Sequence, residues 1–122
     1  MKHEEHILQK WFCQLLYYKL ILQKKGFFFA IPNGEIRGKD RLHSIITGKR
    51  LKDEGVKAGV ADLCILLKNQ TIFIEMKTEK GKQTIYQKEF EAIVKSYGHQ
   101  YYVLHSIKEC EEFLKNVLKI DI

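Results

Sequence analysis

The sequence predicts an α/β fold for residues 1–122 as a single domain. Two observations carry this prediction. Three segments have apolar residues at helical spacing, and four short apolar runs have the length and composition of strands. Their order along the chain is helix, strand, long loop, strand, strand, helix, strand, helix. The sequence has one proline and no internal repeat, which agrees with one compact unit.

The first half of the chain is expected to hold a long helix, a strand and a loop. Apolar side chains recur every three or four residues over residues 4–24, and Gly26 can end that helix in a left-handed conformation. The aromatic run at 27–31 predicts a buried strand that ends at the turn sequence of residues 32–34. Residues 35–59 are rich in glycine and charge, so we expect a long, partly helical loop there, and such loops are often functional.

The second half carries clear helix-start signals. Thr84 precedes Gln87 by three residues, which is the spacing of a capping box, and the helix that follows should end near Gly98. A short apolar run at 101–104 predicts the last strand. Ser106 repeats the capping signal and predicts a C-terminal helix.

Two apolar runs, 61–67 and 71–77, predict an antiparallel hairpin, because only three polar residues separate them. Side chains alternate along a strand, so Glu75 and Lys77 project from the same face. If the hairpin loop has an even number of residues, Asp62 joins that face, and we expect it opposite Lys77. An odd loop would turn Asp62 to the other face.

Two carboxylates without a nearby thiolate or imidazole favour a hard divalent cation, Mg²⁺ or Mn²⁺. Such an ion lowers the pKa of its bound water, and Lys77 could orient or help deprotonate that water. The alternative is an ordinary surface ion pair, because Glu-x-Lys occurs by chance in many strands and usually forms a weak ion pair. Asp62 and Glu75 favour the metal site, since both interrupt apolar runs where an unpaired charge is costly to bury.

Positive charge gathers in two segments on either side of this hairpin strand. Residues 37–57 hold seven basic and three acidic side chains, a balance of +4, and residues 77–88 hold four basic and one acidic, a balance of +3. Both stretches suit a polyanion such as DNA, although lysine-rich loops are often only solvated surface. Six tyrosines could stack on bases, but their positions in helices and strands favour packing in the core or an interface.

The order of several short motifs is similar to a known nuclease family. Ile31-Pro32-Asn33-Gly34, Arg37, the segment Leu51–Asp62, the strand Phe73–Lys77 and the segment Gln83–Gln87 together resemble the VRR-Nuc branch of the PD-(D/E)XK nucleases. The resemblance extends from the first helix through the last strand. It implies a restriction-endonuclease-like αβββαβ core, with a mixed central sheet flanked by helices and a C-terminal helix added.

The resemblance also implies roles for the residues of the hairpin. Asp62 and Glu75 would be metal ligands, the backbone carbonyl of Met76 would lend a further oxygen, and Lys77 would be the catalytic lysine. Ala61 stands where the family has a proline before the aspartate. Proline stiffens the backbone and is no ligand, so this departure concerns loop geometry and leaves the chemistry intact.

Two helices complete the implied site. Glu5 fits the family pattern of a glutamate followed four residues later by a glutamine, here Gln9, although helical periodicity also permits Glu4 as the metal ligand. Gln87 matches the helix glutamine that the family places near the metal among its catalytic residues. Capping of the helix together with Thr84 is an equally physical role for Gln87.

The function expected from this combination is a Mg²⁺- or Mn²⁺-dependent endonuclease that hydrolyses DNA phosphodiester bonds. By resemblance it would act as a homodimer on branched DNA such as Holliday junctions. The alternatives are a catalytically silent DNA-binding module of the same fold and an interaction protein with a basic face. The candidate DNA-contacting residues are Asn33, Arg37, Lys39, Arg41, Lys49, Arg50, Lys52, Lys57, Lys80 and Lys82.

Several other classes of protein are disfavoured. The three cysteines are odd in number and lie among apolar neighbours, which favours reduced core thiols over disulfides or a zinc site. The polar amino end lacks the features of a secretory signal, and no apolar run approaches the ~20 residues that a membrane span needs. We therefore expect an intracellular, cytoplasmic protein with no membrane partner.

Overall fold

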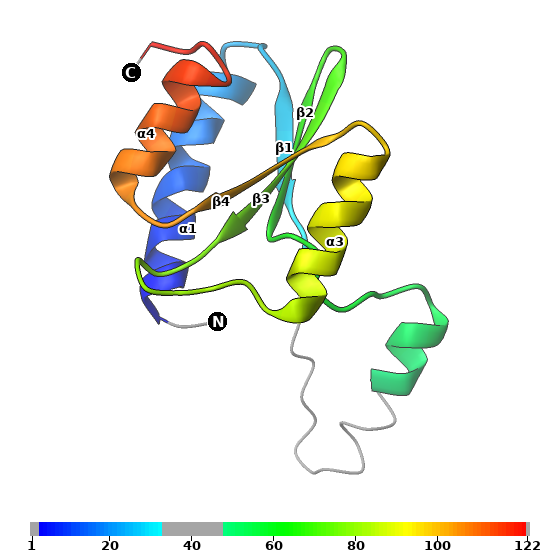
Figure 1. Ribbon diagram of the computed structural model, residues 1–122. Coiled ribbons are helices and arrows are strands. Elements are labelled where there is room, and N and C mark those ends of the chain that lie inside the picture. The colour runs from blue at the N-terminus through cyan, green and yellow to red at the C-terminus, as the bar shows by residue number, and fades with distance from the viewer. Residues whose placement is uncertain (1–2, 33–47, 122) are drawn as a thin grey trace.

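The computed structural model describes residues 3–32 and 48–121. Within these ranges the chain forms an α/β fold in which helices flank a four-stranded mixed sheet (Figure 1). The elements are α1 (His3–Leu16), the π-helical turn η1 (Tyr17–Ile21), β1 (Phe27–Ala30), β2 (Leu63–Leu67), β3 (Gln70–Met76), α3 (Ile85–Ser96), β4 (Gln100–Leu104) and α4 (Ile107–Asn116). A short helical segment at residues 48–53 precedes β2.

The strands lie in the order β1-β2-β3-β4, which is also their order along the chain. β1 pairs with β2 and β2 with β3 in antiparallel fashion, whereas β3 and β4 are parallel. A parallel pair needs a crossover, and α3 supplies it. The predicted order of helices and strands, the mixed sheet and the C-terminal helix are thereby confirmed, whereas much of the loop predicted at residues 35–59 lies outside the described residues.

The end of the first helix differs in detail from its prediction. After α1 the backbone widens into η1, where the Leu22 amide donates to the carbonyl of Tyr17, five residues earlier, at 3.0 Å. The left-handed residue that follows is Lys24, with φ of 56°, and not Gly26. Gly26 has another role: a Cβ there would lie 2.8 Å from the Leu66 carbonyl oxygen, so glycine permits this close approach to β2.

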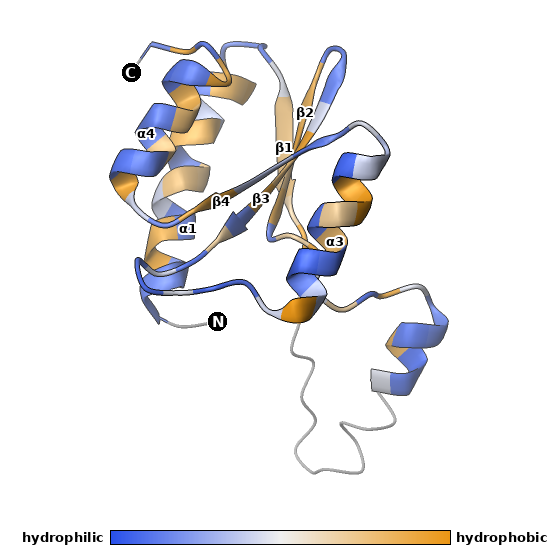
Figure 2. Ribbon diagram, viewed as in Figure 1, coloured by the Kyte–Doolittle hydropathy of each residue, from blue (hydrophilic) through white to orange (hydrophobic). Residues whose placement is uncertain are grey.

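Each face of the sheet has its own apolar cluster (Figure 2). Alternate side chains of β2 and β3 pack against α1 and α4 in the larger cluster, whose members include Phe12, Leu16, Leu63, Ile65, Ile72, Ile74, Met76, Phe113 and Leu114. The opposite face packs against α3, and its cluster includes Phe73, Phe90, Val94, Tyr101 and Val103. Asp62 and Glu75 belong to the α3 side, because they alternate with residues that face α1 and α4.

The strand predicted at residues 27–31 is present as β1, but the prediction that it is buried is wrong. β1 is an edge strand whose Phe27 and Phe29 are 52% and 43% exposed. These two side chains are in register with Leu66 and Cys64, so they lie on the α3 face. The apolar cluster of α3 draws on β3 and β4, at the far edge of the sheet, and leaves β1 uncovered. Only Phe28, on the opposite face, packs against the larger cluster.

The cysteines agree with the prediction of reduced core thiols. Cys64 and Cys110 are buried and Cys13 is half-buried, and all three are free. Burial raises the pKa of all three thiols, that of Cys110 to about 12, which keeps them protonated and unreactive. As for membranes, none of the helices in the described ranges has both the length and the apolar character to span a bilayer.

Candidate active site

The two hairpin carboxylates lie side by side on the α3 face of the sheet. β2 pairs with β3 up to Leu63 and Ile74, and Asp62, the residue before β2, lines one cleft with Glu75. Both are buried, with 6% and 2% of their surface exposed. Acidic side chains are almost never this buried unless they have specific partners. The burial of these two residues therefore indicates a candidate functional site.

The predicted register is wrong by two residues. We expected Asp62 opposite Lys77, with Lys68 paired to Thr71. Instead Leu67 pairs with Gln70, so the turn consists of Lys68 and Asn69 alone. Both registers leave an even number of residues in the loop, and a shift of two residues keeps every side chain on its face. Asp62 and Glu75 line one cleft, in agreement with the expectation that they lie on one side of the sheet.

Asp62 is tied to its neighbours by backbone hydrogen bonds. Its Oδ2 accepts a bond of 2.8 Å from the Met76 amide, and its own amide donates to the Ile74 carbonyl at 3.0 Å. Its carbonyl accepts from the Ile31 amide at 2.8 Å, at the end of β1. The ends of three strands thus fix the position of this carboxylate.

Glu75 has one satisfied and one unsatisfied carboxylate oxygen. Its Oε2 accepts a hydrogen bond of 2.9 Å from Gln87 Nε2, whereas its Oε1 is buried and has no hydrogen-bond partner among the described residues. Burial raises the pKa of Glu75 to about 9, and the charge and hydrogen bond of Asp62 and the charge of Glu5 add to this effect, while Lys77 opposes it. Without a cation, this carboxyl group is therefore protonated at neutral pH.

Gln87 caps its helix, as one of its two predicted roles requires, and it also contacts Glu75. Its backbone amide donates to Thr84 Oγ1 at 3.2 Å and its Oε1 accepts from the Thr84 amide at 2.8 Å, which completes the predicted capping box. The same side chain uses its Nε2 to hold Glu75. The start of α3 and the orientation of the Glu75 carboxylate therefore depend on one amide group.

Of the two glutamates at the start of α1, Glu5 and not Glu4 lines the cleft. Glu5 is half-buried and lines the same cleft as Asp62 and Glu75, whereas Glu4 is exposed and does not line it. Gln9 lies one helical turn after Glu5 and also lines this cleft. Its Oε1 is buried without a hydrogen-bond partner in the described part of the chain. Two oxygen acceptors with unmade bonds, one from α1 and one from β3, thus border one cavity.

The cleft has a volume of about 680 Å³ and a mixed lining. The polar groups already described line it together with Lys77, whose backbone amide is bonded to the Leu104 carbonyl at 3.0 Å. Ala30, Ile31, Pro32, Val60 and Tyr86 also line it. A ligand in this cavity would meet both charged and apolar groups.

A glycine joins the loop before β2 to the start of α3. Gly59 has φ of 82°, and a Cβ there would lie 2.3 Å from the carbonyl oxygen of Tyr86 and 2.8 Å from the amide nitrogen of Gln87. No other residue fits this backbone contact without moving the helix. The loop that leads into β2 is therefore in direct contact with the start of α3 at Gly59.

The donor set fits a divalent cation in its chemistry. Carboxylate and amide oxygens are the ligands of Mg²⁺ and Mn²⁺, and Glu75 Oε1 and Gln9 Oε1 have unmade bonds at the cavity. Across residues 3–32 and 48–121, no three His, Cys, Asp or Glu side chains are gathered tightly enough to form a ready ligand group. Carboxylates on separate elements would have to draw together around an ion.

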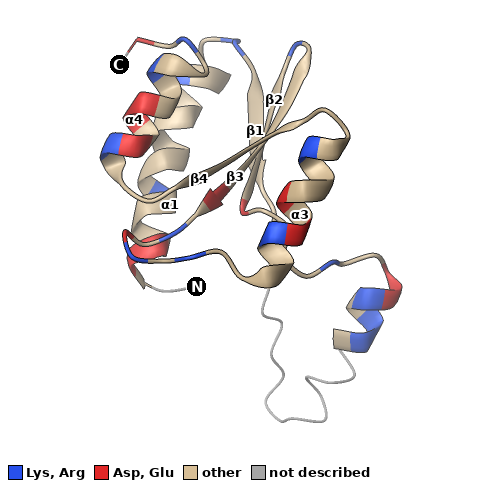
Figure 3. Cartoon of the chain, viewed as in Figure 1, with Lys and Arg blue, Asp and Glu red and all other residues tan. Residues whose placement is uncertain are grey.

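The predicted DNA-contacting residues fall into three groups, and the first lies at the short helix before β2, which is largely blue in Figure 3. Lys49, Arg50 and Lys52 lie on or beside the helical segment 48–53, where Lys49 pairs with Asp53 at 3.2 Å and Arg50 with Glu54 at 4.0 Å. Exposed Lys57, Lys80 and Lys82 lie in the loops before β2 and after β3. The predicted contacts Asn33, Arg37, Lys39 and Arg41 lie outside the described residues.

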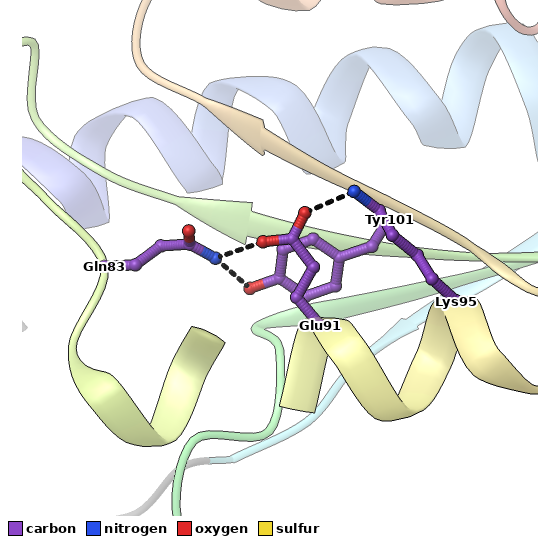
Figure 4. A network of polar contacts seen from close by, with 4 residues as sticks. All are labelled: Gln83, Glu91, Lys95 and Tyr101. Carbon is purple, nitrogen blue, oxygen red and sulfur yellow. Dashed lines mark hydrogen bonds and ion pairs between the residues drawn. The ribbon is translucent and has the colours of Figure 1, made fainter. Parts of the chain in front are cut away.

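A second polar network, which the sequence analysis did not find, fastens α3 to β4 (Figure 4). Gln83 Nε2 donates to Glu91 Oε1 at 3.0 Å and to the buried hydroxyl of Tyr101 at 3.3 Å, and Lys95 Nζ donates to Glu91 Oε2 at 2.6 Å. The spacing of Glu91 and Lys95 is a sequence signal for a helix pair. The links to Gln83 and Tyr101 depend on the tertiary fold.

Comparisons of the chain with protein-family models, with curated proteins and with solved structures find no match.

Proposed function

We propose that the protein is a divalent-metal-dependent deoxyribonuclease with the restriction-endonuclease-like fold of the VRR-Nuc branch. One observation carries the proposal: Asp62 and Glu75 are both buried, and they line one cleft together with Lys77. Burial and the neighbouring Asp62 make it costly for Glu75 to lose its proton. A cation between the two carboxylates would remove that cost and allow both of them to be charged.

Asp62, Glu75 and Glu5 are the residues that would hold Mg²⁺ or Mn²⁺, with the backbone carbonyl of Met76 as a further ligand. The ion would supply an acidified water and neutralise charge on the phosphoryl group. Proton transfer to or from Lys77, which shares the cleft with the carboxylates, would help the water attack. Gln87 is a positioning residue, because it reaches the chemistry through its hydrogen bond to Glu75.

The substrate would be gripped through its phosphates. Lys57, Lys80 and Lys82 are exposed in loops on either side of the hairpin, and the loop that contains Lys57 ends at Gly59, in contact with α3. Such contacts bind DNA through its charge and position it without reading its sequence. Selectivity for branched DNA, such as Holliday junctions, and action as a homodimer are parts of the proposal that rest on the family resemblance.

The test is to incubate the purified protein with labelled linear duplex, flap and four-way-junction DNA in Mg²⁺, Mn²⁺ or EDTA. We expect ion-dependent cleavage that Glu75→Gln abolishes. Glu112→Gln is the matched control, because Glu112 is an exposed glutamate on α4 and should keep full activity. Cleavage that survives Glu75→Gln would place the site elsewhere. Tight junction binding without cleavage in either ion would instead identify a catalytically silent DNA-binding module.

A further inference from the structure

The apolar part of the cleft's wall is unexplained by phosphate hydrolysis alone. Holding an ion and a phosphate requires the polar part, with Asp62, Glu75 and Lys77. The rest of the lining includes Ile31, Pro32, Val60, Ala30 and Tyr86, none of which is expected to hold an ion or a phosphate. Cavities of several hundred Å³ with a few convergent polar groups and an apolar lining are typical of sites for a small organic group.

Tyr86 is the aromatic residue of that wall, and it is not part of the core. It is 58% exposed, although the sequence analysis favoured core or interface packing for the tyrosines. Tyr101, by contrast, is buried in the network of Figure 4. An exposed aromatic ring that lines a cleft loses little conformational entropy when a ligand covers it, because it has only two side-chain torsions.

The backbone that carries Tyr86 is held firmly. The capping box of Thr84 and Gln87 encloses it, and Gly59 packs against its carbonyl oxygen. The next residue, Gln87, is bonded to Glu75. Tyr86 therefore lies one residue before Gln87, the residue that contacts Glu75, in the first turn of a capped helix.

We propose that Tyr86 stacks on a nucleobase next to the phosphate that is cut, so that the cleft selects DNA in which that base is unpaired or opens from its pair at a branch point. This inference rests on the proposed function and specifies its substrate. Aromatic side chains stack on bases of any sequence, because every base has a π face. Inside a duplex, both faces of each base are covered by neighbouring pairs. Only an unpaired base can enter the cavity, with its phosphate toward Lys77.

The test measures binding, so that it does not depend on cleavage. Affinities of the parent and variants are measured in Ca²⁺ and in EDTA for a blunt duplex and for the same duplex with a short unpaired overhang. Tyr86→Ala should weaken overhang binding by about 5- to 100-fold, the loss expected for one base stack, and change duplex binding by less than about 2-fold. Tyr86→Phe, which keeps the ring, should bind both DNAs as the parent does.

Tyr97→Ala is the matched control, because Tyr97 follows α3, is 77% exposed and does not line the cleft. It should leave both affinities unchanged. A spectroscopic arm places 2-aminopurine in the overhang, whose fluorescence should be quenched by the parent and by Tyr86→Phe but not by Tyr86→Ala. Equal losses on both DNAs, no loss on either, or the same loss from Tyr97→Ala would overturn the inference.

The two proposals fail separately. If the parent cuts DNA in Mn²⁺ and Tyr86→Ala cuts overhang and duplex in the parental ratio, the base site is wrong and the nuclease stands. If the parent cuts nothing but the overhang preference depends on Tyr86, the nuclease is wrong and the base site stands. Thermal unfolding of each variant shows whether it is folded, and Tyr86→Leu, which keeps an apolar side chain without the ring, carries the comparison should Tyr86→Ala unfold.

Discussion

Gln87 Nε2 donates a hydrogen bond of 2.9 Å to Glu75 Oε2, while the Oε1 of the same amide caps the first turn of α3. One side chain thus both caps the helix and orients the Glu75 carboxylate. The glutamine that the sequence shows only as part of a capping box therefore also orients Glu75, whose pKa is strongly raised.

Substitution of Gln87 should separate these two effects. Gln87→Ala removes a cap bond and leaves Glu75 Oε2 without its donor, so we expect a loss of about 1–2 kcal/mol in the free energy of unfolding. We also expect cleavage to fall by about 10- to 100-fold, as for other groups that orient metal ligands. Denaturant unfolding and initial cleavage rates measure the two quantities.

Ser106→Ala is the control for that experiment. Ser106 caps α4 through a bond of 3.1 Å from the Glu109 amide, away from the cleft. It should lose similar stability and keep its cleavage rate. Equal activity losses in both variants would mean that Gln87 acts only through stability.

Gly59→Ala should damage the site through the backbone. The new Cβ would collide with the carbonyl of Tyr86, so the start of α3 must move. Gly55→Ala is matched to it, because Gly55 also has a positive φ, 99°, but a Cβ there meets nothing within 4 Å. Both variants should lose about 1 kcal/mol or more from backbone strain. Only Gly59→Ala should also lose cleavage, and similar cleavage by the two would contradict the contact.

The metal-free protein should become less stable as pH rises. The pKa of Glu75 lies near 9 in the fold and near 4.5 when unfolded, because burial and Asp62 disfavour the charged form. The folded state therefore binds the extra proton. Its stabilising contribution is complete below about pH 4.5 and is lost as pH rises toward 9.

Glu75→Gln, which cannot ionise, should remove that dependence. In EDTA, urea unfolding should show the variant to be more stable than the parent by roughly 1–3 kcal/mol at pH 8.5 and nearly equal to it at pH 4.5. A stability difference that is the same at both pH values would show that Glu75 does not carry the buried proton.

Glu5 and Glu4 form a natural pair for testing the helix ligand. Glu5→Gln should weaken Mn²⁺ binding by about 10-fold or more, because it removes a charged oxygen at the cleft. Glu4→Gln makes the same charge change one residue away on an exposed position and should leave affinity unchanged. Titration calorimetry measures both. Equal effects would indicate long-range charge rather than coordination.

The sequence was informative where local rules decide the structure. Alternation along the hairpin strands and an even loop were enough to bring Asp62 and Glu75 to one face. The register was missed because three polar residues separate the runs, and propensity does not reveal that Gln70 belongs to β3.

Contacts between residues distant in the chain could not be predicted from the sequence. The exposure of Phe27 and Phe29 depends on which strands α3 covers, and no local pattern encodes that. The contact of Gly59 with α3 and the link from Gln83 to Tyr101 join residues that are distant in the chain.

Lys77 provides the most direct test of the central claim. Initial rates of Mn²⁺-dependent cleavage of a labelled four-way junction are compared for the parent and Lys77→Met, with junction affinity measured in Ca²⁺. The account predicts that the parent cuts and that Lys77→Met binds the junction normally but cuts about 10²- to 10⁴-fold more slowly. A parent that cuts in neither Mn²⁺ nor Mg²⁺, or a Lys77→Met variant that cuts at the parental rate, would contradict it.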